Sequence, residues 1–276
     1  MQTRFILLSI FLLATNILYG QEIITYKTID STRLQMRVYK PSILENNKKY
    51  KAMVFFFGGG WSKGSPTQFQ SQAAHFVSKG FICFLPDYRV ENRNHTTPFE
   101  ALKDAKSAIR FIKEHAEQFQ VDSASIVAAG GSAGGQLAAA AALIKDYNED
   151  TDNLKISPVA AALVLFNPVV DNGPGGFGYE RIGDAYLHFS PLHNVRQGAP
   201  PTLFMLGKKD HLIPVVTAEY YKMVMEKVGS KCELKLYDNA GHGFFNQNKK
   251  GDNPFYFQTL VATEEFLRSI GYLSKK

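Results

Sequence analysis

Short apolar runs recur along this chain from residue 52 onward, and they restrict the fold more than any other feature of the sequence. Each run is followed by glycine, asparagine, proline or aspartate, and then by a longer segment that can form a helix. The runs span residues 52–57, 81–85, 125–129, 161–166, 202–206 and 232–237. Continuous rather than alternating apolar character is typical of strands in a parallel sheet, where helices cover both faces.

Segments with helical character separate these runs, at residues 71–79, 99–117, 133–145, 215–228 and 255–270. Strands that alternate with helices predict a doubly wound α/β fold. Ahead of them, residues 22–39 alternate in the manner of a β-hairpin, with Asp30 and Ser31 at its turn. No repeat, low-complexity tract or linker interrupts the pattern, so we expect one catalytic domain over residues 21–276.

The first twenty residues have a different character from the rest. Arg4 gives a positive start, residues 5–13 are apolar, and a polar break at Thr15 and Asn16 precedes the small residue Gly20. This layout predicts a secretory signal peptide over residues 1–20, cleaved after Gly20, and is too short and too soon interrupted for a membrane span. We therefore expect a secreted or periplasmic protein.

The charge of the chain excludes one class of partner. Lysine and arginine number 31 against 25 acidic residues, a net charge of +6, but the excess is spread in short pairs such as Lys48-Lys49 and Lys208-Lys209. A nucleic-acid surface needs a basic stripe, usually interleaved with aromatic residues, and no such stripe is present in the sequence. We expect a solvated surface and no nucleic-acid partner.

The most specific motif is the pattern Gly130-x-Ser132-x-Gly134, between an apolar run and an alanine-rich helical segment. A serine on so sharp a strand-to-helix turn takes a strained backbone, which lifts its Oγ clear of the sheet. The two glycines are needed because a Cβ would collide where strand and helix cross. A glycine-rich turn with an incidental serine is the alternative, but the context favours Ser132 as a nucleophile.

Three consecutive glycines, Gly58 to Gly60, follow residues 52–57 directly. They leave backbone N–H groups free to point at one spot, as an oxyanion hole requires, and losing one such donor costs about 3–4 kcal/mol in the transition state. A phosphate-binding loop is excluded because Ser65 stands where that motif needs lysine.

A second glycine pattern, Gly173-x-Gly175-x-x-Gly178, resembles a dinucleotide-binding fingerprint only in its spacing. Pro174 lies inside it, no helical pattern begins there, and no acidic residue follows at the distance needed to hold a ribose. We interpret this stretch as a loop on the side of the active site, and we expect no nucleotide or other cofactor.

The remaining catalytic candidates are Asp210 and His242, each of which follows an apolar run. Buried parallel strands point their carboxyl ends to one side, so both can meet Ser132 there. The chain order Ser132, Asp210, His242 is that of a hydrolytic triad. His242 would take the serine proton, and Asp210 would fix the histidine tautomer while Ser132 attacks an acyl carbon.

Other residues compete for these roles. Asp171 follows residues 161–166 and is the reserve acid. Six further histidines lack flanking glycines after a strand, and we expect packing or surface roles for them: His75, His95, His115, His188, His193 and His211. No cluster of histidine, cysteine and acidic residues has zinc spacing, so no metal is required.

Taken together, these motifs resemble the α/β-hydrolase superfamily, in particular its carboxylesterase branch with hormone-sensitive-lipase-like and bacterial acetyl-xylan or feruloyl esterases. The residues that carry the resemblance are Gly58-Gly59-Gly60-Trp61, Asp87-Tyr88-Arg89, Gly130-Gly131-Ser132-Ala133-Gly134-Gly135, Asp210 to Pro214, and His242-Gly243-Phe244. The resemblance implies an α/β-hydrolase fold with a mostly parallel sheet of about eight strands, helices on both faces and no large cap domain.

The same resemblance implies a set of oxyanion donors, the backbone N–H groups of Gly59, Gly60 and Ala133. In one respect the chain departs from the family, because Phe57 stands where a histidine usually braces the glycine loop. The loop must therefore be held in another way, for which packing of the phenylalanine ring is the candidate.

The strand order implied by the resemblance also bears on the two cysteines. Cys83 would lie on the fourth strand and Cys232 on the eighth, about five strands apart. At about 4.8 Å per strand this is roughly 24 Å, far beyond the ~7 Å limit for a disulfide. We expect two free, buried thiols.

The substrate class follows from what the sequence lacks. Only about forty residues separate the run 161–166 from Asp210, without the long amphipathic helices of a lipase lid. An uncapped site suits short acyl groups on bulky alcohols, such as acetyl or feruloyl esters on polysaccharides. Four loop aromatics either line the pocket or pack locally, and the sequence favours neither: Phe177, Tyr179, Phe244 and Phe245.

The predicted function is thus a secreted serine carboxylesterase of the acetyl-esterase type. One alternative is a serine peptidase of the prolyl-oligopeptidase type, although the chain has no room for a gating domain. The other is a non-catalytic binding protein with a hydrolase fold, which usually has a broken triad. The sequence leaves the oligomeric state open.

Overall fold

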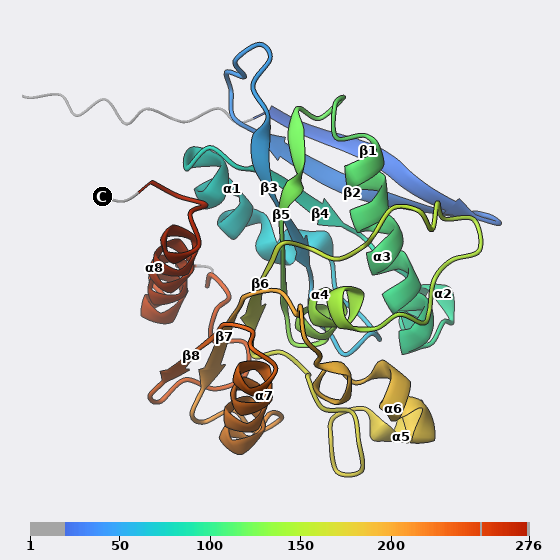
Figure 1. Cartoon of the computed structure of the whole chain (residues 1–276), viewed down its shortest axis with the longest axis vertical. Helices are drawn as coiled ribbons and strands as arrows, with labels where there is room; N and C mark the ends of the chain where they lie inside the picture. The colour runs from blue at the N-terminus through green and yellow to red at the C-terminus, as the bar shows by residue number, and fades with distance from the viewer. Residues whose placement is uncertain (1–19, 249, 275–276) are drawn as a thin grey trace, which may run out of the picture.

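The computed structural model describes residues 20–248 and 250–274, in which one eight-stranded sheet runs in the order β1-β2-β4-β3-β5-β6-β7-β8 (Figure 1). Strand β2 is antiparallel to both of its neighbours, and every other pair is parallel. The strands are β1 Gly20–Ile29, β2 Thr32–Lys40, β3 Tyr50–Phe56, β4 Ile82–Pro86, β5 Val121–Gly131, β6 Ala162–Phe166, β7 Thr202–Gly207 and β8 Cys232–Tyr237.

Helices cover both faces of this sheet (Figure 1). The helices are α1 Gln70–Ser78, α2 Glu91–Asn94, α3 Pro98–Glu114, α4 Ala133–Leu143, α5 Tyr179–Ile182, α6 Tyr186–Phe189, α7 Val215–Lys227 and α8 Pro254–Ser269. Buried residues of α3, α4 and α7 pack on one face, and those of α1 and α8 on the other.

Strand β3 shows why continuous apolar strands need this arrangement. Val54 and Phe56 pack into the core beneath α3 and α4, whereas Met53 and Phe55 pack into the core beneath α1 and α8. Successive side chains of a strand point to opposite faces, so both faces must be apolar when both are covered.

The hairpin of β1 and β2 is tied to the helical layer by buried charges. The Lys27 ammonium lies 2.7 Å from Asp104 of α3 and 2.9 Å from Glu149. The Arg89 guanidinium lies 2.8 Å from Asp104 and 3.0 Å from Glu149. Two cations thus share the buried carboxylate of Asp104 and the half-buried carboxylate of Glu149, which leaves none of these four charges unpaired.

The structure confirms the mostly parallel eight-stranded sheet, the helices on both faces and the hairpin with its turn at Asp30 and Ser31. Between β6 and β7 lie only short helical turns, so no large cap covers this part of the sheet. The predicted signal peptide lies outside the described residues, except for Gly20, which begins β1. Within the described residues, no helix combines the length and apolar character that crossing a membrane requires.

The prediction of two free, buried thiols is also confirmed. Cys83 lies on β4 and Cys232 on β8, and four strands stand between these two in the sheet. Burial raises the pKa of both thiols, that of Cys232 to about 12. Both cysteines therefore act as small apolar core residues.

Candidate active site

Ser132 stands on a sharp turn between β5 and α4, at the carboxyl edge of the sheet. Its backbone has φ +55° and ψ −120°, a left-handed conformation that is strained for any residue with a Cβ. Neighbouring backbone holds the turn, since the Ser132 N–H donates to the Phe166 carbonyl at 2.9 Å and its carbonyl accepts from Gln136 at 3.0 Å.

The glycine at position 134 lets strand and helix approach closely enough to form this turn. A Cβ on Gly134 would overlap the carbonyl oxygens of Phe56 and Phe57 on β3 and its following loop. The first turn of α4 therefore lies directly on the end of β3, and this contact brings Ser132 beside the glycine loop.

His242 connects Ser132 to Asp210 through its two ring nitrogens. Nε2 lies 2.9 Å from Ser132 Oγ, and Nδ1 lies 2.8 Å from Asp210 Oδ2. Because an ionised carboxylate only accepts, Nδ1 carries the proton and Nε2 presents its lone pair to the serine hydroxyl. The structure thus brings together the three side chains predicted from the sequence.

The Asp210 carboxylate is fully buried, and hydrogen bonds from the protein take the place of water around it. Its Oδ1 accepts from the N–H groups of Leu212 at 2.8 Å and Ile213 at 3.0 Å. Burial raises the pKa of Asp210, but the hydrogen bonds from His242 and from these two N–H groups outweigh it, and the net pKa is below the usual value. Asp210 therefore stays ionised and holds the histidine in one tautomer.

The glycine loop lies directly against Ser132. A Cβ on Gly58 would be 3.3 Å from that of Ser132, and Gly59 and Gly60 have positive φ values of +128° and +64°. Among the described residues, no acceptor bonds to the N–H groups of Gly59, Gly60 or Ala133. These three donors, which the resemblance to carboxylesterases suggested, remain available beside Ser132.

Tyr88 braces the glycine loop at Phe57, the position where the resemblance led us to expect a histidine. The rings of Phe57 and Tyr88 stack at 4.0 Å with an angle of 11°, and the Tyr88 hydroxyl donates to the Phe57 carbonyl at 2.7 Å. Packing of Phe57 thus does brace the loop, together with a hydrogen bond that the sequence did not suggest.

Two more side chains fix the loop beyond Phe57. Gln68 Oε1 accepts from the Gly58 N–H at 2.6 Å, and Arg181 donates to the Gly60 carbonyl at 2.8 Å. The guanidinium of Arg181 also lies 5.3 Å from the Trp61 ring. Both peptide groups are thereby restrained, which preorganises the N–H groups between them.

A cavity of about 330 Å³ opens onto Ser132 and His242. Gly59 and Gly60 form part of its wall, and Phe177, Leu212 and Phe245 supply apolar surface. Of the four loop aromatics, Phe177 and Phe245 therefore line the cavity. Phe244 is buried against Tyr237 and Phe255, and the Tyr179 hydroxyl bonds to Asp184 at 3.3 Å.

The reserve acid is placed elsewhere. Asp171 accepts from the Gly173 N–H at 2.9 Å and lies 3.9 Å from His193, whereas Nδ1 of His242 faces Asp210. His211 is a neighbour of the site, with its ring 6.2 Å from that of His242. Groups of three or more metal-binding side chains are not found in the described part of the chain.

One polar residue of the site, Asn167, was missed by the sequence analysis. It follows β6 directly, lines the catalytic cavity and contacts Nε2 of His242 at 3.3 Å. Asn167 follows the carboxyl end of a buried strand, as Asp210 and His242 do. That position is the sequence feature by which it could have been predicted.

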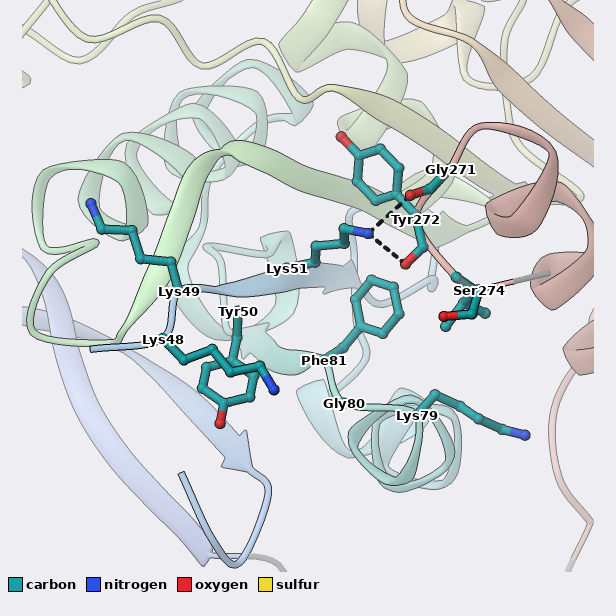
Figure 2. A pocket seen from close by; sticks show the side chains of 11 residues that line it. Lys48, Lys49, Tyr50, Lys51, Lys79, Gly80, Phe81, Gly271, Tyr272 and Ser274 are labelled. Carbon is teal, nitrogen blue, oxygen red and sulfur yellow. Dashed lines mark hydrogen bonds between the residues drawn. The ribbon is translucent and has the colours of Figure 1, made fainter. Parts of the chain in front are cut away.

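A second cavity, of about 410 Å³, lies at the opposite edge of the sheet and is rich in lysine (Figure 2). Three of its four lysines are paired: Lys51 donates to the Gly271 and Tyr272 carbonyls, Lys79 pairs with Glu264, and Lys48 pairs with Glu45. The fourth, Lys49, points away from the other ammonium groups (Figure 2). The ammonium groups do not converge on one point, so this cavity lacks the geometry of an anion site.

Comparison with protein families places the chain among hydrolases. The BD-FAE family model matches residues 36–174, and the dienelactone hydrolase family model matches residues 176–269. The structure of Thermogutta terrifontis esterase 2 phosphorylated by paraoxon is 40% identical with a TM-score of 0.87, covering 93% of this chain and 96% of that one. The propionate-bound form of the same esterase is 39% identical with a TM-score of 0.87 and covers 93% and 97%.

Curated relatives are more distant and longer. Acetylxylan esterase of Xylanibacter ruminicola is 28% identical over 238 residues, which is 80% of this chain and 45% of that protein. Esterase LipC of Mycobacterium tuberculosis is 27% identical over 218 residues, or 71% and 54%. The chain spans about half the length of these curated relatives.

Proposed function

The chain belongs to the α/β-hydrolase carboxylesterases, and from this membership we propose that it is a serine esterase that removes short acyl groups through Ser132, His242 and Asp210. The observation that carries the proposal is the pair of contacts made by His242, 2.9 Å to Ser132 Oγ and 2.8 Å to Asp210. A serine, its base and an orienting carboxylate within hydrogen-bond reach form the arrangement needed for nucleophilic catalysis.

The proposed reaction proceeds in two halves. His242 Nε2 takes the Ser132 proton as Oγ attacks the acyl carbon, and the N–H groups of Gly59, Gly60 and Ala133 donate to the oxyanion that forms. His242 then returns the proton to the leaving alcohol, which departs and leaves an acyl-serine. Water, deprotonated by the same nitrogen, attacks the acyl-serine, and the carboxylic acid leaves as Ser132 is regenerated.

The size of the catalytic cavity supports short acyl groups. Its volume of about 330 Å³ is at the lower end of the range for small-molecule sites, and Phe177, Leu212 and Phe245 stand in its wall. The similar Thermogutta terrifontis esterase has been solved with propionate and with butyrate bound. We propose that acetyl and other short acyl groups fill this space.

For the alcohol half we propose an acylated polysaccharide outside the cytoplasm, as the predicted signal peptide and the acetylxylan esterase relative suggest. A neighbouring cavity of about 370 Å³ offers polar groups for sugar hydroxyls: Glu91, His95, Thr96, Thr97 and Arg181. Arg181 connects the two cavities, because it also donates to the Gly60 carbonyl beside Ser132.

The acyl preference is tested by hydrolysis of p-nitrophenyl acetate, butyrate and octanoate by the purified chain, with Ser132→Ala as the matched control. We expect fast turnover of acetate, a steep fall with chain length, and no activity above background in the variant. Equal turnover of octanoate would contradict a short-acyl site. Inactivity on all three esters would favour the peptidase or binding-protein alternatives.

The alcohol half needs a separate test with a variant outside the triad. His95→Gly removes a side chain from the neighbouring cavity, and glycine suits the left-handed backbone at this position (φ +53°). We expect KM to rise for an acetylated xylo-oligosaccharide and to stay unchanged for p-nitrophenyl acetate. An unchanged KM for both substrates would contradict sugar binding in this cavity.

A further inference from the structure

Asn167 occupies a position that combines backbone strain with complete burial. It directly follows β6 with φ +35°, and its side chain has no exposed surface. Its N–H donates to the Met205 carbonyl at 2.7 Å, which continues the pairing with β7 by one residue. Backbone strain and the burial of a polar side chain both lower the stability of the fold. A residue that combines them usually makes contacts that offset this cost or that serve function.

The hydrogen bonds of the Asn167 amide determine which way the amide faces. The Gly243 backbone N–H lies 3.1 Å from one end of the amide and can only donate, so that end must be the oxygen, Oδ1. The amide NH2 group therefore faces Nε2 of His242, 3.3 Å away. Asn167 thus holds the backbone next to the histidine with one end and contacts its reacting nitrogen with the other.

A donor aimed at Nε2 favours one protonation state of the ring. The Asn167 NH2 group can donate to the Nε2 lone pair of the neutral imidazole. It cannot accept the N–H that Nε2 carries in the imidazolium, so the neutral ring is favoured. The Ser132 hydroxyl, at 2.9 Å, is the other donor to the same lone pair. After Nε2 has taken the serine proton, the Asn167 NH2 group can only repel it, and Ser132 Oγ and the leaving-group oxygen remain its acceptors.

We propose that Asn167 is a positioning residue that keeps His242 Nε2 unprotonated in the resting enzyme and directs its proton to the leaving alcohol. This inference rests on the proposed function, since it requires His242 to be the general base. Among the described residues, the other charged or titratable groups around the ring are Asp210 at Nδ1, His211 with its ring 6.2 Å away, and Lys63 in the wall of the same cavity.

The decisive variant is Asn167→Asp, because it separates the two contacts. Its carboxylate can still accept from the Gly243 N–H, so the backbone anchor is kept. Its second oxygen faces Nε2 and stabilises the imidazolium. Because an opposite charge at this distance favours the charged ring, the pH at which the variant's histidine is half-protonated should rise by roughly 1–3 units. We expect the acid limb of the kcat/KM profile for p-nitrophenyl acetate to move up by about that amount, with activity recovering above it.

Asn167→Leu is the comparison variant, since it keeps the branching at Cγ, although its side chain is larger, and loses both contacts. We expect a lower kcat from the released Gly243 backbone and a much smaller movement of the acid limb than in Asn167→Asp. Circular dichroism and thermal unfolding check that both variants fold. A wild-type pH profile in folded Asn167→Asp, together with a loss of activity in Asn167→Leu, would show that only the Gly243 anchor matters and would overturn the proposal.

Two further results keep the test decisive. If Asn167→Asp does not fold, ¹⁵N chemical shifts of His242 in the wild type and Asn167→Leu report the same contact. We expect the Nε2 shift to change when the amide donor is removed, and an unchanged shift would contradict the inference. If the wild type itself does not hydrolyse the ester, the proposed function fails first, which distinguishes the two failures.

Discussion

At the scale of single residues, the proposed chemistry depends on one buried carboxylate keeping its charge. Burial raises the pKa of Asp210, yet the hydrogen bonds from His242 and two backbone N–H groups bring it below the usual value. A carboxyl group with a lowered pKa stays ionised as the pH falls. The ionised form of Asp210 therefore persists to lower pH than that of an ordinary aspartate, so we expect the loss of activity on the acid side to begin with another group.

This residue leads to a specific prediction for Asp210→Asn. The amide keeps the shape of the side chain but also permits the wrong histidine tautomer, so we expect kcat to fall by about 10⁴ at neutral pH. Steady-state hydrolysis of p-nitrophenyl acetate measures the loss. Asp171→Asn is the control, because Asp171 bonds to Gly173 and not to His242, and equal losses in the two variants would contradict the assignment.

The sequence predicted some of these residues and not others, for a physical reason. Ser132, Asp210 and His242 each follow an apolar run, and parallel strands bring such positions together whatever the details of packing. The roles of Tyr88 and Asn167 depend on which side chain meets which across the fold. Tyr88 reaches Phe57 from the loop after β4, and no spacing in the sequence carries that information.

At the scale of helices and strands, the close crossing of β3 and α4 determines where Ser132 stands. The five main helices lie within a few residues of the segments expected from the sequence, because long amphipathic or apolar segments have strong periodicity. The short helices α5 and α6 were not predicted. Four-residue turns have too little periodicity to detect, and their glycine-rich surroundings indicated a loop.

Gly134→Ala tests the importance of this crossing. An added Cβ would overlap the carbonyl oxygens of Phe56 and Phe57, so β3 and α4 must separate. We expect the free energy of unfolding to fall by about 3 kcal/mol and the esterase activity to be lost, as measured by urea unfolding and ester hydrolysis.

Gly80→Ala is the matched control for that change. Gly80 has φ +88° and open space around the Cβ position, so the substitution introduces backbone strain of about 1–2 kcal/mol without a clash. Activity should be retained in this variant. A loss of activity in Gly80→Ala as large as that in Gly134→Ala would contradict the claim that activity depends on the close crossing of β3 and α4.

At the scale of the whole molecule, the buried ion cluster of Lys27, Arg89, Asp104 and Glu149 joins the amino-terminal hairpin to the catalytic core. Asp104 is fully buried and contacts both cations. Removing it leaves two buried cations with one carboxylate between them. Breaking a buried ion pair in this way typically costs about 3–5 kcal/mol.

We therefore expect Asp104→Ala to lower the free energy of unfolding by about 3–5 kcal/mol in urea titrations. Lys208→Ala, which removes an exposed ion pair with Asp238, should change it by about 1 kcal/mol at most. Similar losses in the two variants would show that the hairpin is not anchored by the buried cluster.

The central claim is that Ser132 is the nucleophile, and covalent labelling tests it most directly. Paraoxon, a diethyl phosphate ester of p-nitrophenol, should be attacked by Ser132 Oγ, releasing p-nitrophenolate and leaving a diethylphosphoryl group on the serine. We predict that mass spectrometry finds a single adduct on the peptide containing Ser132, and that Ser132→Ala is neither labelled nor active on p-nitrophenyl acetate. Labelling at another residue, or full ester hydrolysis by Ser132→Ala, would contradict the account.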